Sequence, residues 1–180
     1  LQLSPQQVND AGFAGLVHDI GKALTPQEVL NKPASLTAGE FALIQSHPRQ
    51  GWQMLTDSGL THEAALDVCL HHHERLDGTG YPERLAGDQI SLMARMGAVC
   101  DVYDAITSNR PYKMGWDPAE SLSRMAKWTD SHLDARVFQA FVRSLGIYPV
   151  GSLVRLNNEK LAVVVEQSQR SLLKPQVKIF

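Results

Sequence analysis

The chain has 180 residues, of which 43% are hydrophobic and 20% are charged, a composition typical of a globular protein with a sizeable core. Seventeen Lys and Arg against nineteen Asp and Glu give a net charge of −2, which excludes the broad basic surface that binds long nucleic acids. No apolar run approaches the roughly 18 residues that span a bilayer, and the N-terminus lacks a signal-peptide pattern. We therefore expect a cytoplasmic protein whose two cysteines, Cys69 and Cys100, are reduced and buried.

Helix-start signals are frequent before residue 147. Each combines a capping side chain with a Pro at the first helical position or with a Gln or Glu three residues later, and they occur at Ser4, Thr25, Thr37 and Asp117. Together with the hydrophobic periodicity, these signals predict helices at about 5–22, 26–31, 38–57, 62–74, 91–108, 118–129 and 134–145. The expected fold class is therefore an all-α helical bundle.

Glycine and proline residues set the predicted interruptions. Pro48 lies inside the third helix pattern and should kink that helix beside His47. The segment 75–90 carries three Gly and a Pro, which predicts a loop. Gly146 is the expected stop of the last helix.

The pattern changes after about residue 147. Residues 152–156 and 161–165 flank Asn157-Asn158 and predict a β-hairpin, to which residues 177–180 could add a third strand. A tail of this size is too small to fold alone. We expect two parts: a helical domain at 1–146 and a small β-rich extension at 147–180 that packs on the helical body.

The run 71–82 holds consecutive imidazoles, two acids and a Gly-rich turn. Stability rarely requires such a run, because a buried imidazole needs a partner for each ring nitrogen. His72 and His73 end a predicted helix, where charged imidazoles would stabilise the helix dipole. As metal ligands they must instead be neutral, and Glu74 and Asp77 could then fix their tautomers.

A second cluster lies upstream, where His18 and Asp19 close the first predicted helix. Adjacent helical residues point about 100° apart, so both side chains can reach metals that lie beside the helix end. Imidazole and carboxylate together suit Mn, Fe, Ni or Zn better than Ca or Mg. Lys22 lies about one turn away, where its ammonium group can meet a phosphate oxygen. Alone, such a pair would be a surface ion pair; with the histidine run, it predicts a multi-metal hydrolytic site.

Further candidates are spread along the chain. His47, at the predicted kink, is either a structural histidine or a ligand. Asp101 and Asp104 are three residues apart on an otherwise apolar helix, and buried acids need cationic partners. Arg110 and Lys113 follow that helix and form either a solvated turn or a contact for a phosphate or a guanine edge. The remaining histidines are interpreted as non-ligands: His62, His71 and His132.

Six motifs in this order resemble the HD-GYP domain, a branch of the HD phosphohydrolase superfamily. The resemblance covers roughly residues 5–145, and the tail is similar to the small β segment that often follows these domains. The motifs are His18-Asp19-Ile20-Gly21-Lys22, His47, His72-His73-Glu74, Asp77-Gly78-Thr79-Gly80-Tyr81-Pro82, Asp101-Val102-Tyr103-Asp104-Ala105 and Arg110-Pro111-Tyr112-Lys113.

The resemblance implies an HD fold that hydrolyses the bacterial second messenger cyclic di-GMP to linear pGpG, to GMP, or to both. It implies two or three divalent transition-metal ions, Fe or Mn in the first place and Ni or Zn as alternatives. A hydroxide that bridges the metals would attack phosphorus in line. The implied ligands are His18, Asp19, His47, His72, His73 and Asp101, with Asp19 bridging two ions.

The resemblance also implies roles around the metals. Asp19, Lys22 and Asp104 would be catalytic: Lys22 would contact the scissile phosphate, and Asp104 would support the site or activate water. The substrate-binding surface would contain Lys22, Tyr81, Arg110 and Lys113. The Gly-rich loop 78–82 could contact partner proteins such as diguanylate cyclases of the GGDEF type.

One departure from the family concerns the N-terminus. Family members carry a further helix before the His-Asp motif, with another His ligand, whereas the 17 residues before His18 contain neither His nor Glu. We therefore expect a longer parent chain, and two metals rather than three in this part of it. Two alternatives to the phosphodiesterase stay open: a catalytically weak sensor or docking module, and an HD phosphohydrolase that acts on another nucleotide.

Overall fold

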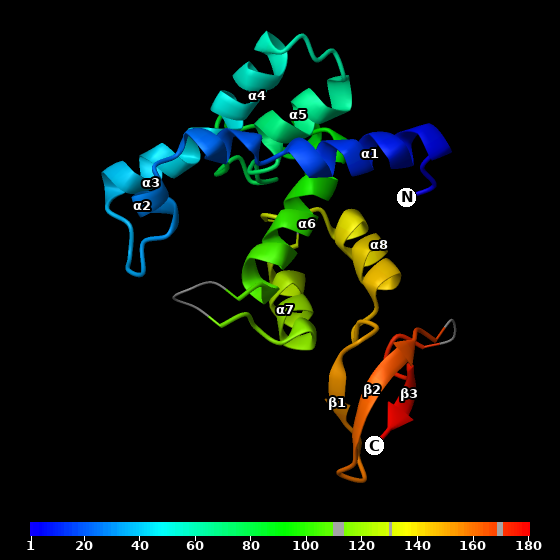
Figure 1. The fold of residues 1–180 in the computed structure, drawn as a ribbon. Coiled ribbons are helices and arrows are strands. Elements are labelled where there is room, and N and C mark those ends of the chain that lie inside the picture. The colour runs from blue at the N-terminus through cyan, green and yellow to red at the C-terminus, as the bar shows by residue number, and fades with distance from the viewer. Residues whose placement is uncertain (110–113, 130, 169–170) are drawn as a thin grey trace.

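Helices form most of the computed structural model, which describes residues 1–109, 114–129, 131–168 and 171–180 (Figure 1). In chain order they are α1 (Pro5–Val17), η1 (Ile20–Leu24), α2 (Gln27–Leu30), α3 (Ala38–Gln45), α4 (His47–Asp57), α5 (Glu63–His71), η2 (Gly87–Gln89), α6 (Leu92–Thr107), α7 (Pro118–Met125), η3 (Ala126–Trp128) and α8 (Ala135–Leu145). Three strands follow: β1 (Leu153–Arg155), β2 (Leu161–Glu166) and β3 (Gln176–Ile179). The predicted helical fold with a small three-stranded tail is confirmed. None of the described helices is long and apolar enough to span a bilayer.

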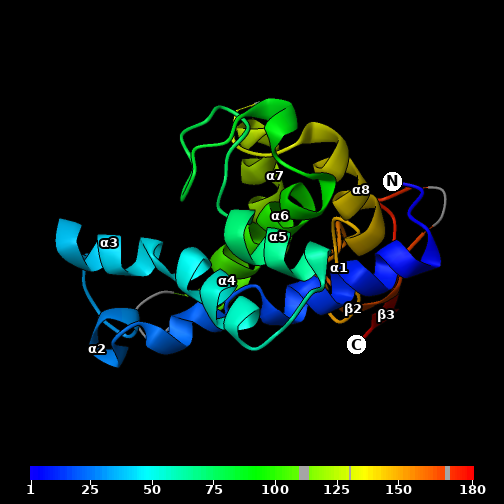
Figure 2. The ribbon, with the colours of Figure 1, turned by 90° about the horizontal axis from the view of Figure 1, so that it is seen from above.

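Helix α6 lies at the junction of two groups of helices. It packs on α5, which also contacts α1 and α4, and elsewhere on α7 and α8 (Figures 1 and 2). The larger buried cluster joins α6 to α7 and α8 and contains Ala98, Val99, Leu122, Met125, Leu133, Val137 and Phe138. The smaller cluster joins α1 to α5 and contains Ala14, Ala65 and Val68. This arrangement brings Asp101 of α6 close to the ends of α1 and α5.

Side-chain caps fix three of the four predicted helix starts. Ser4 and Thr37 each form a reciprocal capping box with the residue three positions later, and Asp117 accepts hydrogen bonds from two amides of α7. The predicted cap at Thr25 is wrong. Helix α2 begins after Pro26, which makes no side-chain cap, and the Thr25 hydroxyl is buried without a hydrogen-bond partner among the described residues.

The third predicted helix is divided into α3 and α4 at Ser46. Proline has no N–H, so Pro48 cannot donate to the carbonyl of Ile44 four residues earlier. The imidazole of His47 donates to this carbonyl from Nδ1 at 2.7 Å. The predicted kink beside His47 is therefore confirmed, and the carbonyl that it frees orients the His47 ring.

The first predicted helix is shorter than expected because the chain turns toward α4. Helix α1 ends at Val17, and η1 follows it. A Cβ atom at Gly21 would lie 2.0 Å from the carbonyl oxygen of His47 and 2.5 Å from the amide nitrogen of Gly51. Glycine is thus required where η1 crosses α4, and this contact holds Asp19 next to the first turn of α4.

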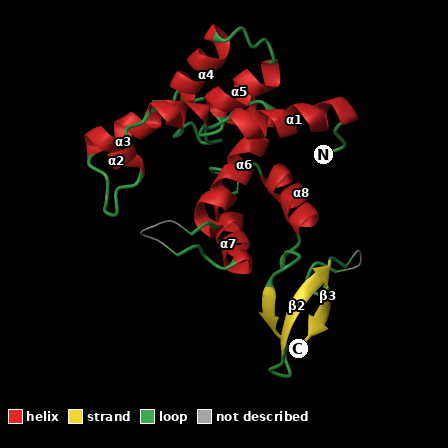
Figure 3. Cartoon of the chain, viewed as in Figure 1, coloured by secondary structure: helices red, strands yellow, loops and turns green. Residues whose placement is uncertain are grey.

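The C-terminal residues form an antiparallel sheet in the order β1-β2-β3 (Figure 3). Gly146, with φ of 80°, ends α8 as predicted, and the predicted hairpin pairs Leu153 with Val163. The sheet lies beyond the C-terminal end of α8 in Figure 1. Gln167 ties it to the connecting segment by a 2.6 Å hydrogen bond to the carbonyl of Tyr148. The division of the chain at residue 146 and the packing of the extension stay predictions.

We expect Gly21→Ala to lower the free energy of unfolding by about 1–3 kcal/mol, because the new methyl group must push the backbone of α4 away. The matched control is Gly12→Ala in α1, where a Cβ atom meets nothing within 4 Å. The higher helix propensity of alanine should raise the free energy of unfolding of this variant by about 0.5–1 kcal/mol. Chemical denaturation measures both. Equal stability of the two variants would show that the crossing of η1 and α4 is not tight.

Candidate metal centre

Four parts of the fold bring the predicted ligands together. Their ligand atoms form two groups that share Asp19: His47, His72 and His73 belong to one, and His18 and Asp101 to the other. The end of α1 contributes His18 and Asp19, the start of α4 contributes His47, the end of α5 contributes His72 and His73, and α6 contributes Asp101. All six predicted ligands therefore lie in one cluster, while their binding of metal stays a prediction.

The two oxygens of the Asp19 carboxylate face different groups. Oδ1 lies 3.2 Å from His47 Nε2 and 3.6 Å from His72 Nε2. Oδ2 lies 3.3 Å from His18 Nε2 and 2.5 Å from Lys22 Nζ. This is the geometry that a carboxylate needs in order to bridge two cations.

Asp101 connects the same groups from α6. Its Oδ1 lies 3.9 Å from His18 Nε2, and its Oδ2 lies 3.6 Å from His73 Nδ1. Burial is the largest influence and would raise the pKa of Asp101, but the imidazoles of His18, His73 and His72 together outweigh it and hold this pKa below its ordinary value. Asp101 therefore keeps a negative charge at neutral pH.

Backbone carbonyls orient three of the imidazoles. The rings of His18, His47 and His72 donate from Nδ1 to carbonyls in the preceding helical turn, at 2.7, 2.7 and 2.9 Å. The proton of each neutral ring is thus placed on Nδ1, which leaves the lone pair of Nε2 for a metal.

Glu74 and Asp77 hold the loop that follows α5, so our expectation that they fix the histidine tautomers is wrong. The buried Glu74 carboxylate accepts hydrogen bonds from the amides of Glu83 and Leu85 at 2.6 and 3.0 Å. Asp77 accepts one from the amide of Thr79 at 2.9 Å. The partners of Glu74 lie nine and eleven residues away, so no local pattern could have identified them, whereas Thr79 is only two residues from Asp77.

The donor set fits divalent transition metals. Asp19 Oδ1 is buried and accepts no hydrogen bond from any described residue, although it faces His47 and His72, which are themselves buried. Neutral rings that donate from Nδ1 have no proton on Nε2 to offer this oxygen. A cation held between the imidazoles and the carboxylate would satisfy both.

Protons compensate part of the negative charge when no cation is bound. The carboxylates of Asp101 and Asp19 raise the pKa of His18 to about 10. Burial would raise the pKa of Asp19, but the side chains that face it, His18 first and Lys22 among the others, together hold it far below its ordinary value. Burial lowers the pKa of His73 to about 3, so this ring is neutral. Metal binding at His18 must therefore displace a proton.

The other predicted site residues differ in where they lie. Lys22, on η1, contacts the shared carboxylate. Asp104 is exposed on α6, where its Oδ1 accepts a hydrogen bond from Ser108 Oγ at 3.1 Å, and no contact in the described ranges joins it to the cluster. Arg110 and Lys113 lie outside the described residues.

Tyr81 covers the cluster from the side of the loop. Its ring stacks on His73 with the ring centroids 4.7 Å apart, and its N–H donates to the His73 carbonyl at 3.2 Å. A Cβ atom at Gly80 would lie 2.5 Å from Glu74 Cα, so this glycine lets the loop lie against the end of α5. Burial raises the pKa of Tyr81, which keeps the phenol protonated.

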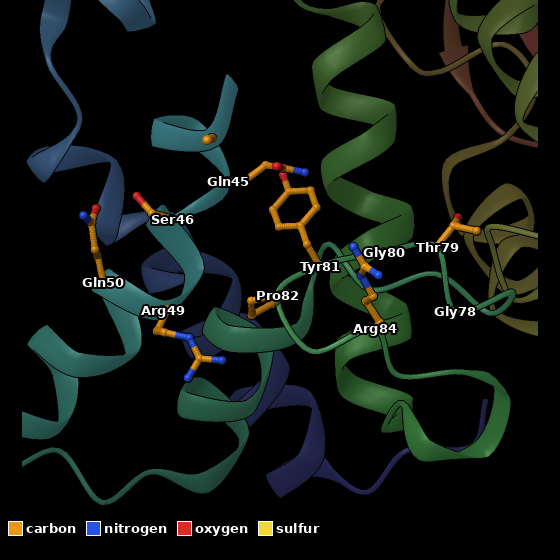
Figure 4. A pocket seen from close by; sticks show the side chains of 11 residues that line it. Gln45, Ser46, Arg49, Gln50, Gly78, Thr79, Gly80, Tyr81, Pro82 and Arg84 are labelled. Atoms are coloured by element: carbon orange, nitrogen blue, oxygen red, sulfur yellow. The ribbon is translucent and has the colours of Figure 1, made fainter. Parts of the chain in front are cut away.

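Two cavities meet at Tyr81. The larger has about 720 Å³ and lies between the α3–α4 region and the loop, where Gln45, Arg49 and Arg84 contribute polar side chains (Figure 4). The smaller has about 470 Å³ and is lined in part by His72 and His73 of the predicted ligand set, which is called the metal cluster below. Phe41, one helical turn before Gln45 on α3, lines this smaller cavity.

Sequence analysis identified His72, His73 and the loop 78–82 among the residues that line these cavities. It did not identify Gln45, Arg49, Phe41 or Trp128, which line them as well. Each is a single side chain within a helix or loop that belongs to no motif. Only the fold shows that Phe41 and Trp128, which are far apart in the sequence, line one cavity with the metal cluster.

A model of the HD domain family matches residues 1–137. The chain belongs to the HD domain family. It is 59% identical over all 180 residues to the cyclic di-GMP phosphodiesterase PA4108 of Pseudomonas aeruginosa and spans 43% of that protein. It is 40% identical over 145 residues to the cyclic di-GMP phosphodiesterase response regulator RpfG of Xanthomonas campestris, covering 79% of the chain and 38% of that protein. It thus spans less than half the length of these curated relatives.

Other relatives carry a different substrate in their names. Over 139 residues the chain is 41% identical to the 3'3'-cGAMP-specific phosphodiesterase 1 of Vibrio cholerae, covering 73% of the chain and 31% of that protein. A crystal structure of a cyclic GMP-AMP specific phosphodiesterase from V. cholerae aligns with a TM-score of 0.57 at 18% identity, covering 79% of this chain and 39% of that one. This structure shows a shared fold. The resemblance of the sequence to HD-GYP domains is confirmed by these comparisons.

We expect Asp19→Ala to lose bound metal from both groups, since each faces one oxygen of this carboxylate. Elemental analysis of protein loaded with Mn or Fe measures the effect. The matched control is Asp57→Ala, an exposed carboxylate on α4 that accepts from Gln53 and should leave the metal content unchanged. Full metal occupancy in folded Asp19→Ala would contradict a bridging role.

Proposed function

We propose that this chain is a metal-dependent phosphodiesterase domain that hydrolyses cyclic di-GMP to linear pGpG, to GMP, or to both. The observation that carries the proposal is the Asp19 carboxylate, whose oxygens face two separate groups of ligands. Phosphodiester hydrolysis commonly uses such pairs of metals. The substrate is supported by the names of relatives that are 59% and 40% identical to the chain.

We propose two divalent ions, with Asp19 between them. Imidazole and carboxylate ligands accept Fe, Mn, Ni or Zn, of which Fe or Mn are our first choice. When bound, such ions polarise the phosphoryl oxygens and lower the pKa of a water nucleophile. The side chains that would hold them are His18, Asp19, His47, His72, His73 and Asp101.

The chain itself supplies charge and position around the ions. Lys22 reaches the outer oxygen of Asp19, so its ammonium group stands where it can neutralise charge that develops on a phosphoryl oxygen. Tyr81 shields one face of His73 from water. We also propose that Asp104 supports the site and that Arg110 and Lys113 bind the nucleotide. These three roles rest on the resemblance to HD-GYP domains alone.

A mixed cyclic dinucleotide is the second candidate substrate, because a relative at 41% identity is named as specific for 3'3'-cGAMP. The metal cluster acts on the phosphodiester bond that both molecules share, so it does not distinguish them. We further propose that the domain acts in the bacterial cytoplasm and that loop 78–82 contacts GGDEF-type diguanylate cyclases.

We expect protein loaded with Mn or Fe under anaerobic, reducing conditions to convert cyclic di-GMP to pGpG or GMP, as resolved by chromatography. Omission of metal and addition of a chelator are the controls, and both should abolish turnover. Intact cyclic di-GMP in the presence of confirmed bound metal would overturn the proposal and favour a binding or docking module.

We expect Lys22→Ala to keep its metals and to lower kcat by about 10- to 1000-fold, as is typical for loss of one electrostatic contact to a transition state. Lys178→Ala, at an exposed position of β3, is the matched control. Steady-state kinetics with parallel metal analysis measure both variants. Turnover of Lys22→Ala at the wild-type rate would show that this ammonium group does not act on the phosphate.

A further inference from the structure

The smaller cavity has the properties of a site for a flat aromatic ring. Its volume of about 470 Å³ lies within the roughly 300–1000 Å³ typical of small-molecule sites. His72 and His73 form part of its wall, so a ligand in it would lie beside the metal cluster. Most of the remaining lining is apolar and comes from α3, α6 and the segment that follows α7.

Two aromatic side chains from different elements line this cavity. Phe41 of α3 is 49% exposed and belongs to neither buried cluster, so packing does not explain a phenylalanine at this position. Trp128 of η3 is partly buried against the larger cluster and also lines the cavity. Nucleobases stack on such side chains without regard to sequence. The pair therefore suits a purine or pyrimidine ring.

Arg75 is the arginine that lines this cavity, and it is exposed. It pairs with no carboxylate in the part of the chain that the structure describes, as is also true of Arg84 and Arg143, but of these three only Arg75 lines this cavity. The neighbouring acids are engaged elsewhere: Glu74 accepts from two loop amides, and Asp77 lies 3.7 Å from His132 Nε2. The guanidinium thus has donors that no described acid satisfies.

The arginine fork distinguishes the two purines. Guanine presents two acceptors, O6 and N7, on the edge that an arginine reads with two parallel hydrogen bonds, whereas adenine presents a donor in place of O6. An arginine at the edge of an aromatic cavity therefore favours guanine.

We propose that the cavity is the base subsite of this domain: Phe41 and Trp128 hold a purine ring by stacking, and Arg75 selects guanine. The inference rests on the proposed function, since it identifies the base of the nucleotide that lies beside the metal cluster. Arg75 is then a specificity-determining residue, and Phe41 supplies affinity for either purine.

The test measures how the metal-loaded protein hydrolyses bis(p-nitrophenyl) phosphate, a phosphodiester that carries no nucleobase. GMP and AMP are added as competitive inhibitors, and an inhibition constant is determined for each. We expect GMP to inhibit the wild type more strongly than AMP. Arg75→Gln should reduce this preference about tenfold, which corresponds to loss of one bidentate base contact. Phe41→Ala should weaken inhibition by both nucleotides about tenfold, as expected for loss of one stacking partner. Phe41 is exposed, so its truncation leaves the buried clusters intact.

The ratio of the two inhibition constants is the decisive readout, because a general loss of folding or metal changes both constants alike. Arg143→Gln, an exposed arginine on α8 outside the cavity, should retain the wild-type ratio. An unchanged ratio in Arg75→Gln, or unchanged constants in Phe41→Ala, would overturn the base subsite. Failure to cleave cyclic di-GMP with the guanine preference intact would instead refute the proposed function and leave the subsite standing.

Discussion

The Asp19 carboxylate has to face imidazoles from two directions, and much of the surrounding structure serves this requirement. Its Oδ1 is turned toward the rings of α4 and α5, and its Oδ2 toward the end of α1. Asp19 lies where the chain leaves the regular helix α1 and enters η1. The change from α1 to η1 frees this position, and Gly21 then allows η1 to lie directly on α4. The end of α1 at Val17 and the close contact of Gly21 with α4 together place Asp19 between the two groups of ligands.

Pro48 has two effects that reinforce each other. It interrupts the helix, and the missing N–H leaves the carbonyl of Ile44 without its usual partner. The His47 imidazole donates a hydrogen bond from Nδ1 to that carbonyl, and its Nε2 then faces Asp19. A backbone carbonyl that lacks its usual helical partner therefore orients a predicted ligand.

How much the sequence predicts depends on the range of the interaction. The kink at Pro48 and the caps at Ser4 and Thr37 are local, and the sequence predicts them correctly. The clustering of the six residues was predictable from the resemblance to HD-GYP domains, which assigned His47 and Asp101 to the same site as the two adjacent pairs. Tertiary contacts were not predictable. Thr25 has the local signature of a cap and does not act as one, and Glu74 bonds to amides nine and eleven residues away.

The metal cluster also lies between the two hydrophobic clusters of the helical body. The smaller joins α1 to α5 and the larger joins α6 to α7 and α8, whereas the polar cluster takes ligands from both groups of helices. Two carboxylates, Asp19 and Asp101, meet there, and hydrogen bonding to them raises the pKa of His18 to about 10. The Lys22 ammonium group, 2.5 Å from Asp19 Oδ2, supplies a second positive charge. Divalent cations would displace the proton of His18 and connect the two groups of helices, so bound metal and the contact between the two cores would involve the same side chains.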